Sequence, residues 1–222
     1  GYVDNLEESG IMDIFRLPKF SYYFFQSQRK YEPNNKFSQP MLHIASYWQP
    51  SLSKDVRIFS NCDEVELFID GKSQGRRTPD NNKISEHLKH PPFTFNATCI
   101  KAGKLKAVGY INKQKVTEQV IATAGDADRI KLTLDESGTL PSAGSNDVLF
   151  VYAQICDKNG NQVVNYNNQI DFSIEGDAEI VYNSSAQAEA GIASILIKIG
   201  KRQQPVTITA SGKNLKQDKL VF

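Results

Sequence analysis

Residues 64–71 read Glu-Val-Glu-Leu-Phe-Ile-Asp-Gly. Apolar side chains alternate with charged ones along this stretch, and only Phe68 interrupts the alternation. An extended chain with this period of two has one apolar face and one polar face. The closing Asp70-Gly71 pair suits a type I′ turn, because such a turn needs positive φ at both central residues. The stretch therefore predicts a half-buried β-strand that leads into a hairpin.

Similar short runs, rich in β-branched and aromatic residues and separated by turn signals, fill most of the chain. The first set occupies residues 41–47, 55–60, 64–69, 93–100, 105–111 and 115–122. After the Gly- and Asp-containing residues 124–128, a second set occupies 129–134, 148–155, 170–174, 179–182, 190–199 and 205–210. Each set has the strand spacing of a sandwich, and the two sets do not align as a repeat. We predict an all-β fold of two different immunoglobulin-like β-sandwiches.

A short helical stub precedes the strands. Residues 18–28 read Pro-Lys-Phe-Ser-Tyr-Tyr-Phe-Phe-Gln-Ser-Gln. The positions i, i+3, i+4 and i+7 of one helix face are Phe20, Tyr23, Phe24 and Ser27. Pro18 suits the first helical position, and Tyr22 and Phe25 extend the apolar surface, so we expect this helix to be covered on two sides. The predicted domains are the stub at 1–30, a first sandwich at 31–125 and a second at 126–222.

Composition excludes several classes of function. The chain has 222 residues, with 26 Lys and Arg against 25 Asp and Glu, a formal charge of +1. That balance argues against a nucleic-acid partner, which selects for a basic surface. No apolar run approaches the ~20 residues of a membrane helix, so we expect no membrane insertion. The sequence has no phosphate loop, dinucleotide fingerprint or Gly-x-Ser-x-Gly elbow, and we expect no cofactor.

The cysteines and histidines do not predict a metal site. Cys62, Cys99 and Cys156 are an odd number at unrelated spacings, which suits free buried thiols, although Cys62 and Cys99 could meet across a sandwich. His87 and His90 lie three residues apart, but no third ligand converges with them in the sequence. We therefore expect no metal.

Acidic residues also favour structural roles. Glu64 and Glu66 lie on the polar face of one strand, where a solvated surface is the simpler interpretation than a glycosidase pair. Asp126 and Asp128 lie in the segment between the two strand sets and suit ordinary loop polarity. Residues 157–161 begin like a calcium loop, but the glycine comes too early and no bidentate Glu follows. We predict a turn there.

The candidate carbohydrate-binding residues are Trp48 and its neighbour Tyr47. Trp48 is the single tryptophan of the chain and can stack on a sugar ring if its face is exposed. The alternative is that it packs in the core or at a domain junction. His43, in the first predicted strand, suits a hydrogen-bonded structural role.

Several stretches resemble one family. Residues 9–28 resemble the end of the catalytic barrel in bacterial family 2 glycoside hydrolases of the β-galactosidase type. Residues 41–48 and 56–73 are similar to the accessory sandwich that follows that barrel, most specifically in Ser-Asn-Cys-Asp-Glu-Val-Glu-Leu-Phe at 60–68. Members often have His and Asn where this chain has Tyr47 and Asp70. Residues 129–222 resemble the C-terminal immunoglobulin-like domain of these enzymes, which is related to invasin-type repeats.

The resemblance implies a non-catalytic accessory region. Both catalytic glutamates of the family lie on barrel strands upstream of the stub, so no glutamate here inherits their role and the fragment is not itself an enzyme. The implied parent hydrolyses β-galactosides or related β-glycosides in a bacterial periplasm or outside the cell. The implied partners are the barrel of the same parent chain and, weakly, a second copy through the aromatic stub. The alternatives are a carbohydrate-binding module and an adhesin-like immunoglobulin-fold segment.

Overall fold

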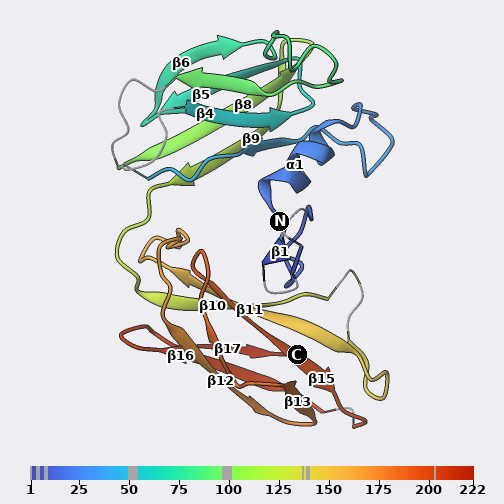
Figure 1. The fold of residues 1–222 in the computed structure, drawn as a ribbon, viewed down its shortest axis with the longest axis vertical. Helices are drawn as coiled ribbons and strands as arrows, with labels where there is room; N and C mark the ends of the chain where they lie inside the picture. The colour runs from blue at the N-terminus through green and yellow to red at the C-terminus, as the bar shows by residue number, and fades with distance from the viewer. Residues whose placement is uncertain are drawn as a thin grey trace. The chain divides into compact units, whose positions relative to one another are not determined.

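The computed structural model describes residues 2–3, 6–7, 10–49, 55–96, 102–136, 138, 141–202 and 204–222. Residues 2, 3, 6 and 7 are described by their backbone alone. The chain divides into two compact units, Gly1–Thr123 and Ala124–Phe222 (Figure 1). The described residues are almost entirely β-structure with a single helix, so the predicted all-β fold is confirmed.

The first unit contains the helix and nine of the described strands. These elements are β1 (Tyr2–Val3), β2 (Leu6–Glu7), α1 (Phe20–Ser27), β3 (Leu42–Ile44), β4 (Asp55–Ser60), β5 (Glu64–Ile69), β6 (Lys72–Arg77), β7 (Phe93–Asn96), β8 (Lys104–Ile111) and β9 (Gln114–Ala122). Strands β1 and β2 pair with each other. The others form two antiparallel sheets, of order β3-β4-β7 and β6-β5-β8-β9.

The core of the first unit lies between these two sheets. Alternate residues of β4 and β5, such as Val56, Ile58, Val65 and Leu67, are at most 1% exposed, as the period of two predicts. They pack with Phe93, Phe95, Leu105 and Ala107 from β7 and β8. Asp70 and Gly71 take φ values of 48° and 79°, the positive pair that the predicted β5–β6 hairpin requires.

Helix α1 covers the outer face of the β3-β4-β7 sheet. His43 of β3 and Phe59 of β4 are paired neighbours on that face. The ring of Tyr23 stacks on His43 with centroids 3.5 Å apart, and the ring of Phe24 meets Phe59 edge-on at 5.5 Å. Ser27, one turn further along, is 1% exposed. The predicted helix face is therefore the face that packs.

The ends of α1 differ from the prediction. Lys19 occupies the N-cap position in an extended conformation, so the first helical residue is Phe20 rather than Pro18. Pro18 instead forms an isolated antiparallel bridge with Met12. The helix ends at Ser27, and Gln28 is its C-cap, with its N–H bonded to the Phe25 carbonyl at 3.2 Å.

The second unit is a sandwich of two four-stranded antiparallel sheets. Its strands are β10 (Arg129–Leu134), β11 (Val148–Cys156), β12 (Gln169–Glu175), β13 (Ala178–Val181), β14 (Ser185–Gln187), β15 (Ile192–Ile199), β16 (Thr207–Gly212) and β17 (Asp218–Val221). The sheet orders are β10-β11-β15-β13 and β14-β12-β16-β17. Ile155, Ile170, Ile197 and Ile208 are completely buried between them, so this unit has a core of its own.

Five strands were missed in the sequence: β1, β2, β6, β14 and β17. All five lie at the edge of a sheet. Strand β6 shows why, because five of its six residues are exposed and none is apolar apart from a glycine. An edge strand is held by backbone hydrogen bonds to one neighbour and needs no apolar face, so hydrophobic alternation does not reveal it.

Candidate functional site

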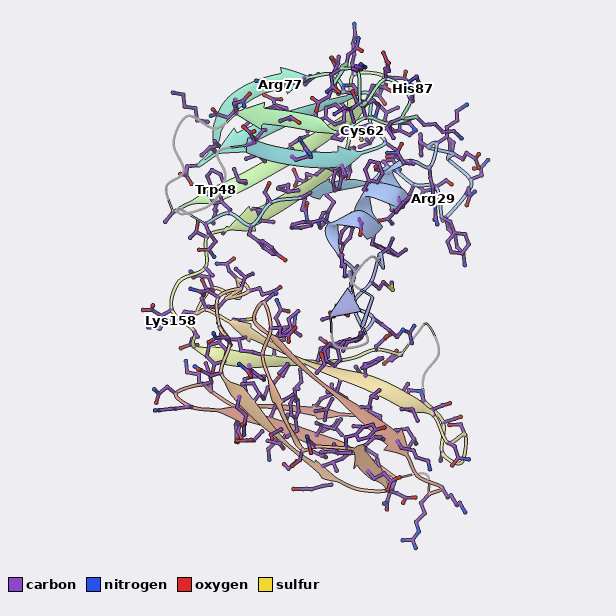
Figure 2. The ribbon with its side chains drawn as sticks, in the orientation of Figure 1. Arg29, Trp48, Cys62, Arg77, His87 and Lys158 are labelled. Carbon is purple, nitrogen blue, oxygen red and sulfur yellow. The ribbon has the colours of Figure 1, made fainter. Side chains whose placement is uncertain are left out.

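The two candidate carbohydrate-binding residues lie in different environments. Trp48 is 4% exposed and belongs to the core of the first unit (Figure 2). Its carbonyl accepts a hydrogen bond of 2.9 Å from the Thr123 hydroxyl. A buried indole offers no face to a sugar, so the structure matches the core-packing alternative for this residue. Tyr47 is 48% exposed, and its ring lies 5.2 Å from Phe20 at an interplanar angle of 46°, which is not a flat platform.

His43 is the polar centre of the contact between α1 and its sheet. Besides the stacked Tyr23 ring, the ring of Phe20 lies 5.9 Å away. Burial lowers the pKa of His43 from 6.5 to about 4, because the aromatic surroundings disfavour the charged imidazolium. Its Nε2 atom has no hydrogen-bond partner among the described residues, so the predicted hydrogen-bonded role is not what this nitrogen shows. The neutral ring acts as an aromatic packing surface.

Two amide side chains fasten the end of α1 to the first unit. The Gln28 amide donates to the carbonyl of His90 at 2.7 Å and accepts from the His90 N–H at 3.2 Å. The buried Asn61 amide donates to the carbonyls of Arg29 and Gln39 and accepts from the Met41 N–H at 2.8 Å. Through these hydrogen bonds to backbone groups, the two side chains connect the end of α1 to other segments of the unit. The helix is therefore an integral part of this unit.

Glu64 and Glu66 belong to a polar network on the outer face of the β6-β5-β8-β9 sheet. Glu66 accepts hydrogen bonds from the hydroxyls of Ser73 at 2.6 Å and Tyr110 at 3.0 Å. Arg76 lies 3.4 Å from Glu64 and 3.8 Å from Glu66, with its guanidinium over the Tyr110 ring. The Ser73 hydrogen bond, with help from Tyr110 and Arg76, lowers the pKa of Glu66. A general acid needs the opposite shift, so this pair fits the predicted solvated strand face.

The histidines and cysteines do not assemble into a metal site in the part of the chain that the structure describes. The His87 side chain is 86% exposed, and its Nε2 atom lies 3.5 Å from a carboxylate oxygen of Glu86. Cys62 and Cys156 are free and buried, as expected of thiols that act as small apolar side chains. Cys99 lies outside the described residues, and the free Cys62 does not fit the alternative in which these two cysteines are paired.

Asp157 organises the turn at residues 157–161. Its carboxylate accepts hydrogen bonds from the backbone N–H groups of Gly125, Asn159 and Asn161 and from the Asn161 amide, all within 3.0 Å. Burial raises the pKa of this carboxyl, but these hydrogen bonds outweigh that effect and hold it at about 2. Since four N–H donors surround the carboxylate, it is bound as a structural anion, which agrees with the predicted turn.

One hollow of the second unit has no signal in the sequence. It encloses about 420 Å³ and is lined by apolar side chains such as Pro141, Val206 and Phe222, with Asp177 and Arg202 at its side. The Asp177 carboxylate accepts the Arg202 N–H at 2.6 Å. The lining residues come from separate loops and chain ends, so only the folded chain brings them together. They include no nucleophile with an adjacent base.

Two domain families match the chain. Residues 52–117 match a domain of unknown function, DUF4982. Residues 130–221 match the glycoside hydrolase family 2 C-terminal domain 5. These matches fall within the first and second units respectively.

Similar relatives are longer glycosidases. The chain is 30% identical over 224 residues to a β-galactosidase of Thermoanaerobacter pseudethanolicus, a match that covers 95% of this chain and 29% of the relative. It is 30% identical to a β-galactosidase of Bacteroides ovatus, over 77% of this chain and 18% of that protein. It is 27% identical to a β-glucuronidase of Formosa agariphila, over 94% of this chain and 21% of that protein. The chain thus spans less than a third of the length of these relatives.

Solved structures give the same result. A β-glycosidase from Bacteroides vulgatus matches 96% of this chain and 27% of its own length with a TM-score of 0.79, and at 24% identity this likeness concerns the fold. A family 2 β-glucuronidase matches 96% of this chain and 22% of its own length with a TM-score of 0.75 at 26% identity. Residues 130–221 thus match the C-terminal domain of family 2 glycoside hydrolases, and the chain as a whole matches a small part of longer glycosidases, as a C-terminal region of such an enzyme would.

Proposed function

We propose that the chain is the accessory region of a β-galactosidase- or β-glucuronidase-like glycoside hydrolase, where it buttresses the catalytic barrel and helps to shape its substrate cleft. The observation that carries the proposal is that the N-terminal segment packs on the first unit while some of its apolar side chains stay exposed. One side of α1 is fixed to the first unit through Tyr23, Phe24 and Gln28. Two apolar side chains of the same N-terminal segment remain in solvent: Ile14 is 64% exposed and Phe25 is 58% exposed. An apolar surface beside a rigid anchor suits a further part of the same protein.

The reaction of the parent protein is proposed from its similarity to β-galactosidases and β-glucuronidases. β-Galactosidase and β-glucuronidase relatives favour a β-glycoside substrate with a terminal galactose or glucuronic acid. Within this chain, the Glu64 and Glu66 carboxylates are engaged with Arg76 and neighbouring hydroxyls. We therefore assign bond cleavage to the catalytic barrel of the parent. In the same proposal, the parent acts in a bacterial periplasm or outside the cell.

The isolated chain has an additional expected property. With Ile14 and Phe25 exposed, a second copy can cover the same surface when the barrel is absent, which gives weak self-association. In the parent protein the barrel would occupy that surface. Self-association is therefore a consequence of isolation in this proposal and not a function.

The test compares the 222-residue chain with the full-length product of the gene that encodes it. Aryl β-galactoside and aryl β-glucuronide turnover is expected from the full-length protein and not from the chain. In the full-length protein, Ile14→Asp with Phe25→Asp should speed heat inactivation several-fold. Ile84→Asp is the control, because Ile84 is 88% exposed at a site distant in sequence. A full-length protein without glycosidase activity, or equal inactivation rates for both variants, contradicts the proposal.

A further inference from the structure

Two hollows adjoin at one end of the second unit. The hollow of about 420 Å³ described above shares Asp177, Ile199 and Arg202 with a second hollow of about 570 Å³. The second hollow is lined by residues 176–179 before and in β13, by residues 198–202 at and after the end of β15, and by Asn146. Volumes of this size are typical of small-molecule sites in proteins. We name the two hollows together the Arg202 hollow.

Close backbone contacts hold the sides of the Arg202 hollow together. The Asp177 carbonyl accepts the Gly200 N–H at 2.7 Å, and the Asp177 carboxylate accepts the Arg202 N–H at 2.6 Å. A side chain at Gly200 would collide with Asp177, and one at Gly176 would collide with the Pro205 carbonyl. The hollow is therefore built by contacts between separate segments of the fold, which fix its lining residues relative to one another.

The Arg202 hollow has more cationic than anionic side chains. Its lining includes Lys198, Lys201 and Arg202 against Asp177 and Glu179. Lys198 lies 3.9 Å from Glu179, and the Asp177 carboxylate is engaged by the Arg202 N–H. In the described part of the chain, neither the Lys201 ammonium nor the Arg202 guanidinium has a hydrogen bond or an ion pair, and both residues are exposed. Two accessible cations at one hollow favour an anionic ligand.

The donors and walls of the hollow indicate which anion fits. The planar guanidinium of Arg202 can donate to both oxygens of a carboxylate. The Gly200 and Arg202 N–H groups are already bonded to Asp177, so these backbone donors are not available to cradle a phosphate. The adjoining apolar lining, with Pro141, suits the C–H surface of a sugar ring, and the Asn146 amide suits its hydroxyls. A carboxylate carried on a sugar ring therefore matches both parts of the hollow.

We propose that the Arg202 hollow binds a saccharide that carries a carboxylate, such as a terminal uronic acid. The carboxylate lies on Arg202 and Lys201, and the ring lies against the apolar lining. This inference rests on the proposed function, because that proposal includes a β-glucuronide among the substrates of the parent. It gives the accessory region a saccharide-binding role of its own.

The test titrates the isotope-labelled 222-residue chain and follows the NMR signals of its backbone N–H groups. Three probes separate the ring from the charge: methyl β-D-glucuronide, methyl β-D-glucoside, which lacks the carboxylate, and acetate, which lacks the ring. Arg202→Gln removes a cation of the hollow. Lys158→Gln is the matched control, because this exposed cation follows the end of β11 at Cys156, whereas Lys198 pairs with Val148 at the start of that strand.

Methyl β-D-glucuronide is expected to bind with a Kd of about 1–10 mM and to shift the signals of residues 176–179 and 198–202. The glucoside and acetate should each bind about tenfold more weakly or less, since each lacks half of the recognised chemistry. Arg202→Gln should weaken glucuronide binding by about tenfold or more while its other signals stay in place, and Lys158→Gln should bind as the unsubstituted chain does.

Failure of the glucuronide to saturate the chain would overturn the inference, as would shifts confined to other residues. Equal binding of acetate would mean an adventitious ion only, and equal binding of the glucoside would mean that the cations play no part. Unchanged binding by Arg202→Gln would place the ligand elsewhere, so each of these results contradicts the proposal. Aryl glycoside turnover by the full-length protein is measured separately, so an inactive full-length protein contradicts the proposed function and leaves the binding result to decide on the hollow.

Discussion

At the scale of single residues, the carboxylate of Asp157 joins the start of the second unit to a turn between its strands. It is 2% exposed and accepts four hydrogen bonds from N–H groups. We expect Asp157→Asn to lower the free energy of unfolding by about 1–3 kcal/mol at neutral pH, because an amide cannot accept on both sides. Asp126→Asn, at an exposed position, should change it by less than about 0.5 kcal/mol.

The pH dependence of this effect has a definite sign. The pKa of Asp157 is lowered from 3.8 to about 2 in the folded chain, so its contribution is present above pH 3.8 and is lost as the pH falls toward 2. Denaturant titrations between pH 7 and pH 2 should therefore show the two proteins converge at the acid end. A constant difference across that range would contradict the assigned role of the carboxylate.

His43 gives a second residue-scale prediction, with its pH window at higher pH. Its pKa is lowered from 6.5 to about 4, so the unfolded chain takes up a proton before the folded chain does. Stability should fall as the pH drops from 6.5 to 4. His43→Phe keeps a ring against Tyr23 and should remove this part of the slope, whereas His87→Gln, at an exposed position, should keep it. Thermal unfolding at a series of pH values measures both slopes.

At the scale of elements, α1 is held by one face, and two adjacent phenylalanines test this. Phe24 packs edge-on against Phe59 at 5.5 Å, whereas Phe25 is 58% exposed. We expect Phe24→Ala to lower the unfolding free energy of the first unit by about 1.5–3 kcal/mol. Phe25→Ala should change it by less than about 0.5 kcal/mol in the isolated chain. Equal losses in denaturant titrations would mean that α1 is not docked by the predicted face.

At the scale of the whole molecule, each unit has its own buried cluster. Leu67 belongs to the core of the first unit and Ile197 to that of the second, and both are completely buried. We expect Leu67→Ala and Ile197→Ala each to lower the stability of their own unit by about 2–5 kcal/mol and to leave the other unit unchanged. Calorimetry or hydrogen exchange resolved along the chain would report this, and a single shared transition shifted by both variants would contradict it.

The sequence by itself predicted the elements whose pattern is local. Residues 55–60, 64–69 and 129–134 were predicted as strands with the bounds that the structure has, because each alternates between a buried and a solvated side. The packing face of α1 followed from spacing alone, and the Asp70-Gly71 turn followed from the φ values that such a turn requires. These features depend on residues within one strand, turn or helix.

Only the tertiary structure decided features that join distant parts of the chain. Trp48 is buried because strands far along the sequence close over it, and neither its type nor its neighbours required that. The edge strands β6 and β14 are held by the backbone hydrogen bonds of a partner strand, and their own side chains do not alternate between a buried and an exposed side. Likewise, only the strand register sets Phe150 beside Leu196, and Leu196 beside Val181. Periodicity shows which residues of one strand share a side, whereas strand pairing determines which strands adjoin and so which apolar sides merge into one surface.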